Sequence, residues 1–122
     1  IQEAIIDFTK CLELASRTRE PPFILQVWYR LGQAYHRIHR YEDALRDYTD
    51  FIHRCESAGE QGLDGLSKGL VARGKTYQAL FELDKALKDM NRANELTEES
   101  NPYYLCCRAS VYVWKNDKQK AE

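Results

Sequence analysis

The segment GLVARGKT, residues 69–76, has the spacing of a phosphate-binding loop, G-x-x-x-x-G-K-[ST]. In such a loop, glycine-rich backbone amides surround a phosphate and follow an apolar strand. Here the preceding segment LDGLSK, residues 63–68, has no run of β-branched residues. The chain also has no second apolar strand ending in an aspartate that could hold magnesium. We therefore expect the segment to be helical and to bind no nucleotide.

Histidine and cysteine pairs offer two further sites for chemistry. His36 and His39 are three residues apart, but no cysteine or acidic residue stands at a metal-ligand spacing beside them. Cys106 and Cys107 are adjacent rather than arranged as Cys-x-x-Cys, and neither G-x-S-x-G nor H-E-x-x-H occurs. We expect surface histidines, free thiols, no metal or other cofactor, and no enzymatic activity.

The composition is that of a globular chain with balanced charge. Among 122 residues, 43% are hydrophobic, and 18 basic residues face 19 acidic ones. This balance gives no overall attraction to nucleic acid or to anionic lipid. No apolar run approaches the ~20 residues that a membrane span needs, and the chain shows no signal-peptide pattern. Four cysteines without a disulfide spacing suit a reducing compartment. We expect a cytoplasmic protein without nucleic acid or membrane partners.

Helical patterns fill nearly the whole chain. Apolar residues recur three and four positions apart, strand patterns are absent, and glycine and proline interrupt the chain only at short connections. Short connections favour antiparallel neighbours. The pattern predicts an all-α fold with helices at 2–16, 22–38, 41–57, 64–80, 84–97 and 102–115, and another beginning near 118.

One spacing of small and bulky residues recurs along the chain. Trp28, Gly32, Tyr35, Ala44 and Tyr48 are followed, 42 residues later, by Leu70, Gly74, Tyr77, Ala86 and Met90. A further copy, 35 residues later, consists of Leu105, Ala109, Tyr112 and Ala121. The second half of the unit has a shared phrase, which reads AIIDF at 4–8, ALRDY at 44–48 and ALKDM at 86–90.

This pattern resembles the tetratricopeptide repeat (TPR), in which a first helix carries Trp, Leu, Gly and Tyr and a second carries spaced alanines. Trp28, Leu31, Gly32 and Tyr35 match the first helix of that repeat. The resemblance implies antiparallel helix-turn-helix repeats that stack into a right-handed superhelix, with glycine and alanine where helices cross closely. A single array over 1–122 would then comprise a lone second helix at 1–16, repeats at 22–58 and 64–98, and a truncated repeat at 102–122.

The chain departs from the family pattern in its loops and at one first-helix position. The loops SRTREPP and ESAGEQGLDG lengthen two units beyond the usual repeat, and Arg73 and Arg108 stand where the first unit has Leu31. Because half-buried arginines need partners, we expect ion pairs between successive repeats, Asp47 with Arg73 and Asp89 with Arg108. We also expect a longer array around this segment, since a bare solenoid end exposes its apolar face.

The resemblance implies a concave face that is lined by the first helices and binds a peptide. Fifteen such positions contain no acidic residue, and their cations and aromatic rings suit an acidic segment with an apolar anchor. The groove residues that we expect are Tyr29, Gln33, His36, Arg37, Lys68, Val71, Lys75, Gln78, Tyr103, Ser110 and Trp114.

The sequence also bears on two alternatives to this prediction, a chaperone tail as the ligand and a scaffold function. The chaperone-binding clamp of the family needs lysines, asparagines and an arginine, but the corresponding positions here hold Tyr29, Gln33, Ala72, Tyr103 and Cys107. We therefore expect no binding of a chaperone's C-terminal carboxylate. The alternative function is a structural scaffold or spacer that docks through its convex or end surfaces in a large assembly.

Overall fold

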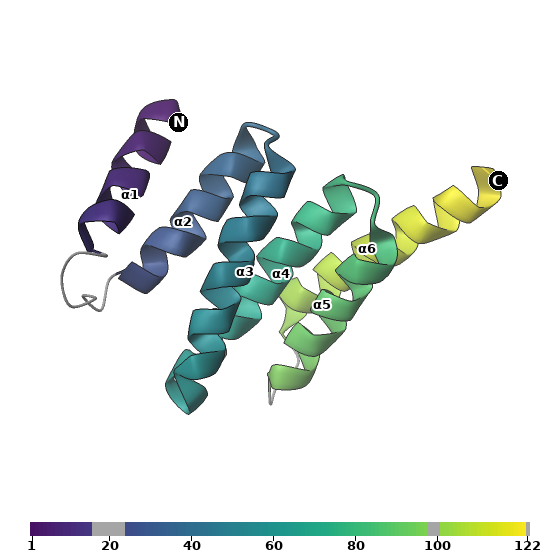
Figure 1. The fold of residues 1–122 in the computed structure, drawn as a ribbon. Coiled ribbons are helices and arrows are strands. Elements are labelled where there is room, and N and C mark those ends of the chain that lie inside the picture. Colours follow the sequence, from purple (N-terminus) through teal and green to yellow (C-terminus); the bar gives the residue numbers. More distant parts are fainter. Residues whose placement is uncertain (16–23, 98–100, 122) are drawn as a thin grey trace.

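The computed structural model describes residues 1–15, 24–97 and 101–121, and these ranges contain helices and no strand (Figure 1). The all-α prediction is confirmed. The expected helix residues at 16 and at 22–23 lie outside the described parts of the chain. The helices are α1 (Gln2–Ala15), α2 (Ile24–Arg37), α3 (Tyr41–Ser57), the short 3₁₀ helix η1 (Gly59–Gly62), α4 (Leu63–Ala79), α5 (Leu83–Leu96) and α6 (Pro102–Ala121).

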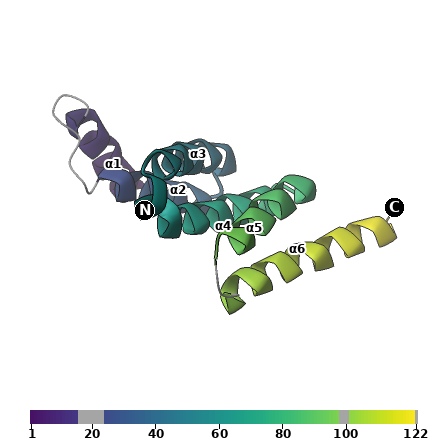
Figure 2. The same cartoon turned by 90° about the horizontal axis from the view of Figure 1, so that it is seen from below.

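The helices form two stacked hairpins with one further helix at each side. Figure 1 shows α2 paired with α3 and α4 paired with α5, and α3 packs against α4 to join the hairpins. Helix α1 packs on α2, and α6 packs on α5 and α4. Seen from below in Figure 2, the helices follow one another from α1 at one end to α6 at the other, the arrangement of an α-solenoid.

The same backbone turn ends the first helix of each hairpin. His39 has φ 63° and Phe81 has φ 60°, so both are left-handed residues without being glycine. The next residue's amide donates back to the helix in each case, Arg40 to the Tyr35 carbonyl and Glu82 to the Tyr77 carbonyl, both at 2.9 Å. A left-handed residue with this return hydrogen bond is a common way to end a helix.

Glycines lie where the two helices of a hairpin approach most closely. A Cβ on Gly32 would be 2.6 Å from Cδ1 of Tyr48, and a Cβ on Gly74 would be 3.0 Å from Cε of Met90. The opposing alanines, Ala44 and Ala86, are completely buried. The predicted close crossings at Gly32 and Gly74 are therefore confirmed.

The prediction for the last unit is wrong in two respects. Helix α6 continues to Ala121, so no second helix begins near 118, and Ala121 does not take the place of Ala44. The residues KNDKQK at 115–120 lack glycine and proline and include good helix formers, so nothing local stops the helix. Ala109, predicted at a helix crossing, is exposed, as is Tyr112 of the same pattern, and no described helix packs on them.

The predicted ion pairs between successive repeats are also wrong. Arg73 donates from Nε and Nη2 to the two carboxylate oxygens of Asp89, both at 2.8 Å, and Asp89 lies on α5 of the same hairpin. Asp89 thus pairs with the first helix of its own hairpin rather than with the next repeat. Arg108 donates to Oδ1 of Asn91 at 3.1 Å instead of pairing with Asp89.

Asp47 occupies the position of Asp89 in the first hairpin but lacks its partner. The corresponding first-helix residue there is Leu31, and the nearest cation is Arg46, with its Nε 3.6 Å from Oδ1. Asp47 is only 1% exposed, and its Oδ2 accepts no hydrogen bond. Burial raises the pKa of Asp47 to about 6. The two hairpins therefore share a buried acid, which accepts two close hydrogen bonds from Arg73 in one hairpin and has one longer ion pair with Arg46 in the other.

The two crossing glycines should differ in how strongly an added methyl group destabilises the fold. Gly32→Ala should lower the free energy of unfolding by about 1–3 kcal/mol, because the rigid ring of Tyr48 cannot move out of the way. Gly74→Ala should cost less, because the flexible Met90 side chain can rotate. Urea unfolding of both variants measures the difference, and a larger cost at Gly74 would contradict this account.

Replacing each of the two buried aspartates by asparagine should change the stability of the fold in opposite directions. The raised pKa means that Asp47 binds a proton more tightly in the folded chain, so the stability associated with that proton is lost as pH rises from about 4 through about 6. Asp47→Asn should therefore stabilise the fold at pH 7 by about 1–3 kcal/mol. Asp89→Asn should destabilise it by about 3 kcal/mol, since Arg73 loses its charged partner. Unfolding at pH 4 and pH 7 measures both effects, and equal losses of stability at pH 7 would show that Asp47 is as well paired as Asp89.

Candidate functional site

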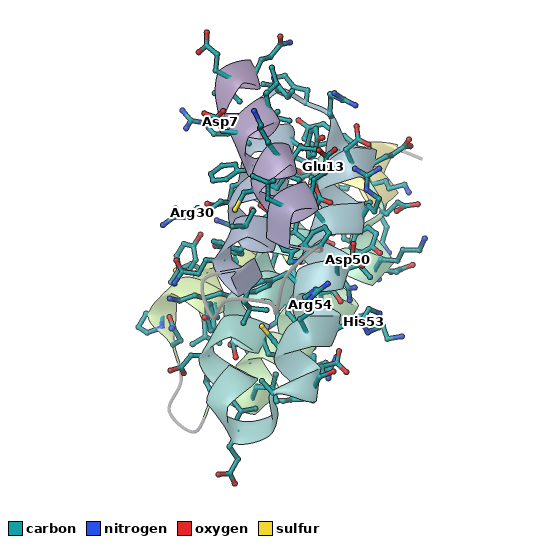
Figure 3. All side chains as sticks on the ribbon, turned by 60° about the vertical axis from the view of Figure 1, so that its left-hand side comes forward. Asp7, Glu13, Arg30, Asp50, His53 and Arg54 are labelled. Atoms are coloured by element: carbon teal, nitrogen blue, oxygen red, sulfur yellow. The ribbon has the colours of Figure 1, made fainter. Side chains whose placement is uncertain are left out.

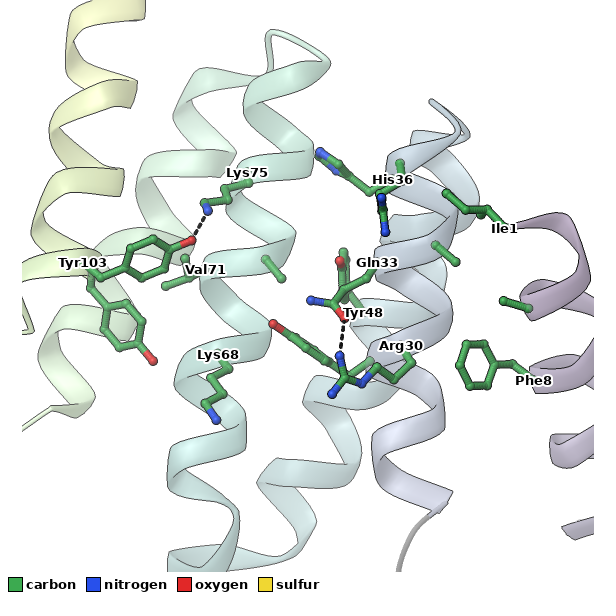
Figure 4. A pocket seen from close by; sticks show the side chains of 16 residues that line it. Ile1, Phe8, Arg30, Gln33, His36, Tyr48, Lys68, Val71, Lys75 and Tyr103 are labelled. Carbon is green, nitrogen blue, oxygen red and sulfur yellow. Dashed lines mark hydrogen bonds between the residues drawn. The ribbon is translucent and has the colours of Figure 1, made fainter.

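A groove of about 610 Å³ runs along the face formed by α2 and α4, with α1 and α6 at its two sides (Figure 4). The first helices supply most of its walls, because residues three and four apart share a helix face. The lining side chains are Tyr29, Arg30, Gln33, Ala34, His36 and Arg37 from α2, Lys68, Val71, Ala72 and Lys75 from α4, Ile1, Ala4 and Phe8 from the first residues of the chain, Tyr48 from α3, and Tyr103 and Tyr104 from α6.

Aromatic rings form part of the groove wall between the two hairpins. The ring of Tyr29 lies 5.9 Å from that of Tyr48 and 5.2 Å from that of Phe51, measured between centroids. Tyr48 comes from a second helix and extends past Gly32, whose missing side chain leaves it room. Burial raises the pKa of Tyr29, so its hydroxyl stays protonated at neutral pH. The groove thus offers flat apolar contact together with phenolic hydroxyls.

Positive charge gathers in the groove although the whole chain has a net charge of −1. Arg30, Arg37, Lys68 and Lys75 line it, and none of the sixteen lining residues is acidic. Arg30 donates to Oε1 of Gln33 at 3.3 Å. Within residues 1–15, 24–97 and 101–121, the ion pairs formed by lysine and arginine involve other cations, such as Arg73 and Lys115. The groove is therefore a local basic surface whose charge is not offset by neighbouring carboxylates.

Hydrogen bonds hold the side chains of Lys75 and His36 in the groove. Burial alone would lower the pKa of Lys75, but the amine donates to the hydroxyl of Tyr103, and the pKa is raised overall. His36 Nδ1 lies 2.9 Å from the hydroxyl oxygen of Thr76 on α4. Burial and the nearby charge of Lys75 lower the pKa of His36. At neutral pH the positive charge of the groove thus comes from its lysines and arginines rather than from His36.

Eight of the eleven expected groove residues line this groove: Tyr29, Gln33, His36, Arg37, Lys68, Val71, Lys75 and Tyr103. The other three lie elsewhere. Gln78 donates to the Ser110 hydroxyl at 3.1 Å, which joins α4 to α6, and the ring of Trp114 packs 5.2 Å from that of Phe81.

Eight of the sixteen lining side chains were not among the expected groove residues: Ile1, Ala4, Phe8, Arg30, Ala34, Tyr48, Ala72 and Tyr104. Arg30 follows Gln26 by four residues and precedes Gln33 by three, so its helical spacing could have placed it on this face. Tyr48 belongs to the recurring spacing of small and bulky residues, which does not by itself place it in the groove. Its reach into the groove depends on the space beside Gly32, which no local pattern reveals.

The other candidate sites do not form in the described parts of the chain. Residues 69–76 lie inside α4, where backbone amides bond along the helix, and the hydroxyl of Thr76 donates to the Ala72 carbonyl at 3.0 Å. His39 Nδ1 lies 2.7 Å from the hydroxyl oxygen of Tyr41. No cluster of three metal-ligating side chains occurs among the described residues. None of the helices described is both long enough and apolar enough to cross a membrane.

Comparison with known proteins agrees with the architecture. A family model described as "Tetratricopeptide repeat" matches residues 25–52 and 67–100, which fall on the α2–α3 and α4–α5 hairpins and together make up half of the chain. No curated protein matches the chain. The repeated hairpins, their glycine crossings and the two matched segments together show that the chain belongs to the tetratricopeptide repeat family.

Proposed function

We propose that the groove between α2 and α4 binds an acidic peptide segment of a protein partner. TPR repeats generally mediate protein–protein interaction, and the family is not catalytic. The observation that carries the proposal is the charge of the groove: four cations and no carboxylate among its sixteen lining side chains. A peptide with several carboxylates gains favourable interactions along such a surface, and an acidic wall would repel it.

The apolar part of the groove suggests what else the peptide carries. Tyr29 and Tyr103 come from different helices, and Val71 and Ala72 lie between them on α4. Aromatic and aliphatic contacts of this kind anchor peptide side chains, while charged groups around them fix orientation and association rate. The proposed ligand is therefore an acidic segment with at least one aromatic or aliphatic residue.

The groove chemistry favours an internal segment over a chain terminus. The positions of a carboxylate clamp are occupied by Tyr29, Gln33, Ala72, Tyr103 and Cys107, which supply no lysine or arginine. Arg30, Arg37, Lys68 and Lys75 instead distribute positive charge along the groove. Several carboxylates spaced along a peptide match that distribution better than one terminal group.

A scaffold function remains the second candidate, and one observation favours it. Helix α6 exposes the large apolar side chains of Tyr112, Val113 and Trp114. Large apolar side chains that gather on one surface mark interaction sites. An exposed helix surface of this kind suits docking in a larger assembly and does not require the groove.

A peptide array tests the proposal. In it, the net charge of the peptides and the presence of one phenylalanine vary independently. Fluorescence anisotropy should then show that the best acidic peptide binds the protein. Raising the salt concentration should lower its affinity, because exposed charges are screened beyond about 10 Å at 0.1 M salt. Lys68→Glu with Lys75→Glu should reduce its affinity at least about tenfold, which corresponds to about 1.4 kcal/mol.

A control of equal charge change separates the groove from the general field of the protein. Lys88 and Lys118 are exposed and do not line the groove, so Lys88→Glu with Lys118→Glu should leave the affinity nearly unchanged. Tyr29→Ala should weaken binding at all salt concentrations. Equal losses in the two lysine variants, or a preference for basic peptides, would refute groove binding of an acidic segment.

A further inference from the structure

Lys75 and Tyr103 meet in the groove and form one polar cluster between α4 and α6. The Lys75 amine donates to the phenolic oxygen of Tyr103, and its nitrogen lies 4.5 Å from the centre of the Tyr103 ring (Figure 4). Tyr103 is 54% exposed. Its polar end is therefore held at the groove wall and is still accessible to a ligand.

The start of α6 fixes the backbone that carries Tyr103. Asn101 Oδ1 accepts the backbone amide of Tyr103 at 2.9 Å and that of Tyr104 at 3.4 Å, which is the arrangement of a helix N-cap. Pro102 takes the first helical position, where its fixed φ suits a helix start. Tyr104 and Cys107 are buried in the hydrophobic core shared with α4 and α5. A ligand therefore meets a turn that is already ordered, which lowers the entropic cost of binding.

The hydrogen bond within this cluster leaves donors available to a ligand. An ammonium group has three N–H donors and no acceptor, so the bond to Tyr103 uses only one donor of Lys75. For the same reason, the hydroxyl proton of Tyr103 cannot be donated to Lys75 and can go to a ligand. A hydroxyl that accepts from a cation also becomes a stronger donor, because successive hydrogen bonds polarise one another.

Tyr29 adds a second hydroxyl to the same region of the groove. Burial and the nearby Tyr103 raise the pKa of Tyr29. The charges of Arg30 and Lys75 act on this pKa in the opposite direction. Tyr29 therefore lies within electrostatic range of the Lys75–Tyr103 cluster, and its protonated hydroxyl is a further donor.

Among the described residues, no carboxylate in the groove accepts from these donors. None of the sixteen lining residues is acidic. Figure 3 shows Asp7 on α1 and Asp50 on α3, and neither of these acids lines the groove. Charge-assisted hydrogen bonds are roughly twice as strong as neutral ones. The donors therefore favour a ligand group that brings negatively charged oxygen atoms.

We infer that Lys75, Tyr103 and Tyr29 form a subsite for one side-chain oxyanion of the bound peptide, a carboxylate or a phosphate. The inference rests on the proposed function and adds a fixed register to it. The other cations of the groove attract negative charge along the whole segment, whereas this subsite selects the position of one acidic residue. A glutamine at that position would be rejected, because its own N–H donors would face those of the subsite.

A glutamate-to-glutamine scan of the best acidic peptide from the array tests the subsite, with fluorescence anisotropy as the measurement. At one peptide position, the replacement should weaken binding to the parent at least about fivefold more than binding to Tyr103→Phe, because the variant lacks the donor to that charge. Tyr29→Phe should single out the same position. Equal factors for parent and variants at every position would overturn the inference, and so would different positions for the two tyrosines.

A second background shows whether the Tyr103 hydroxyl contacts the peptide itself. In Lys75→Met the effect of Tyr103→Phe should persist at the same peptide position, because the hydroxyl can still donate. An effect that disappears with the amine would overturn the inference, since Tyr103 would then act only by positioning Lys75. Phosphoserine at that position separates the two sources of the oxyanion. A larger effect of Tyr103→Phe with phosphoserine than with glutamate assigns the subsite to a phosphate, and the reverse assigns it to a carboxylate.

A matched control and the groove variant keep the two proposals separate. Tyr112 is an exposed tyrosine of α6 that does not line the groove, so Tyr112→Phe should bind every peptide like the parent. Circular dichroism should show the parent's helicity in each variant. A peptide that binds Lys68→Glu with Lys75→Glu as tightly as the parent would refute groove binding. A peptide that loses affinity there, with no position coupled to Tyr103, would refute the subsite alone.

Discussion

The contact between a glycine on each first helix and a bulky side chain on the second is the constraint on which the structure depends. Ring carbons of Tyr48 occupy the space that a Cβ of Gly32 would take, and Met90 does the same at Gly74. Because helices packed this closely have little freedom to shift, the hairpins repeat with the same geometry. The stacked hairpins then hold the outer faces of α2 and α4 side by side as the walls of one groove.

Local patterns were sufficient to predict most of the fold. The helices around Gly32 and Gly74 and their pairing follow from apolar spacing and from the recurrence of small residues. The expected helix near 118 failed because helix formers alone do not determine where a helix ends. The first helices of the two full hairpins are followed by the left-handed residues His39 and Phe81. Histidine adopts this backbone comparatively often, but a bulky phenylalanine does so rarely, so packing rather than propensity imposes the turn at Phe81.

The candidate site was less predictable because it depends on which helices face each other. A helical spacing shows that Arg73 and Asp89 each point toward a neighbour, but it does not show which one, and the wrong neighbour was predicted. Trp114 shares the predicted first-helix face, yet it packs against Phe81 outside the groove. Residues near the middle of the array, such as Lys68, were easier to place because helices on both sides fix their surroundings.

The basic face between α2 and α4 is the proposed ligand surface of this TPR protein. Backbone amide chemical shifts, followed during titration with an acidic peptide that carries one phenylalanine, test it most directly. The account predicts saturable shifts that gather within residues 29–37 and 68–75, with His36 titrating at a higher pH once the peptide adds negative charge beside it. Saturable shifts confined to α5 or to residues 112–114 of α6, with the groove amides unchanged, would contradict it.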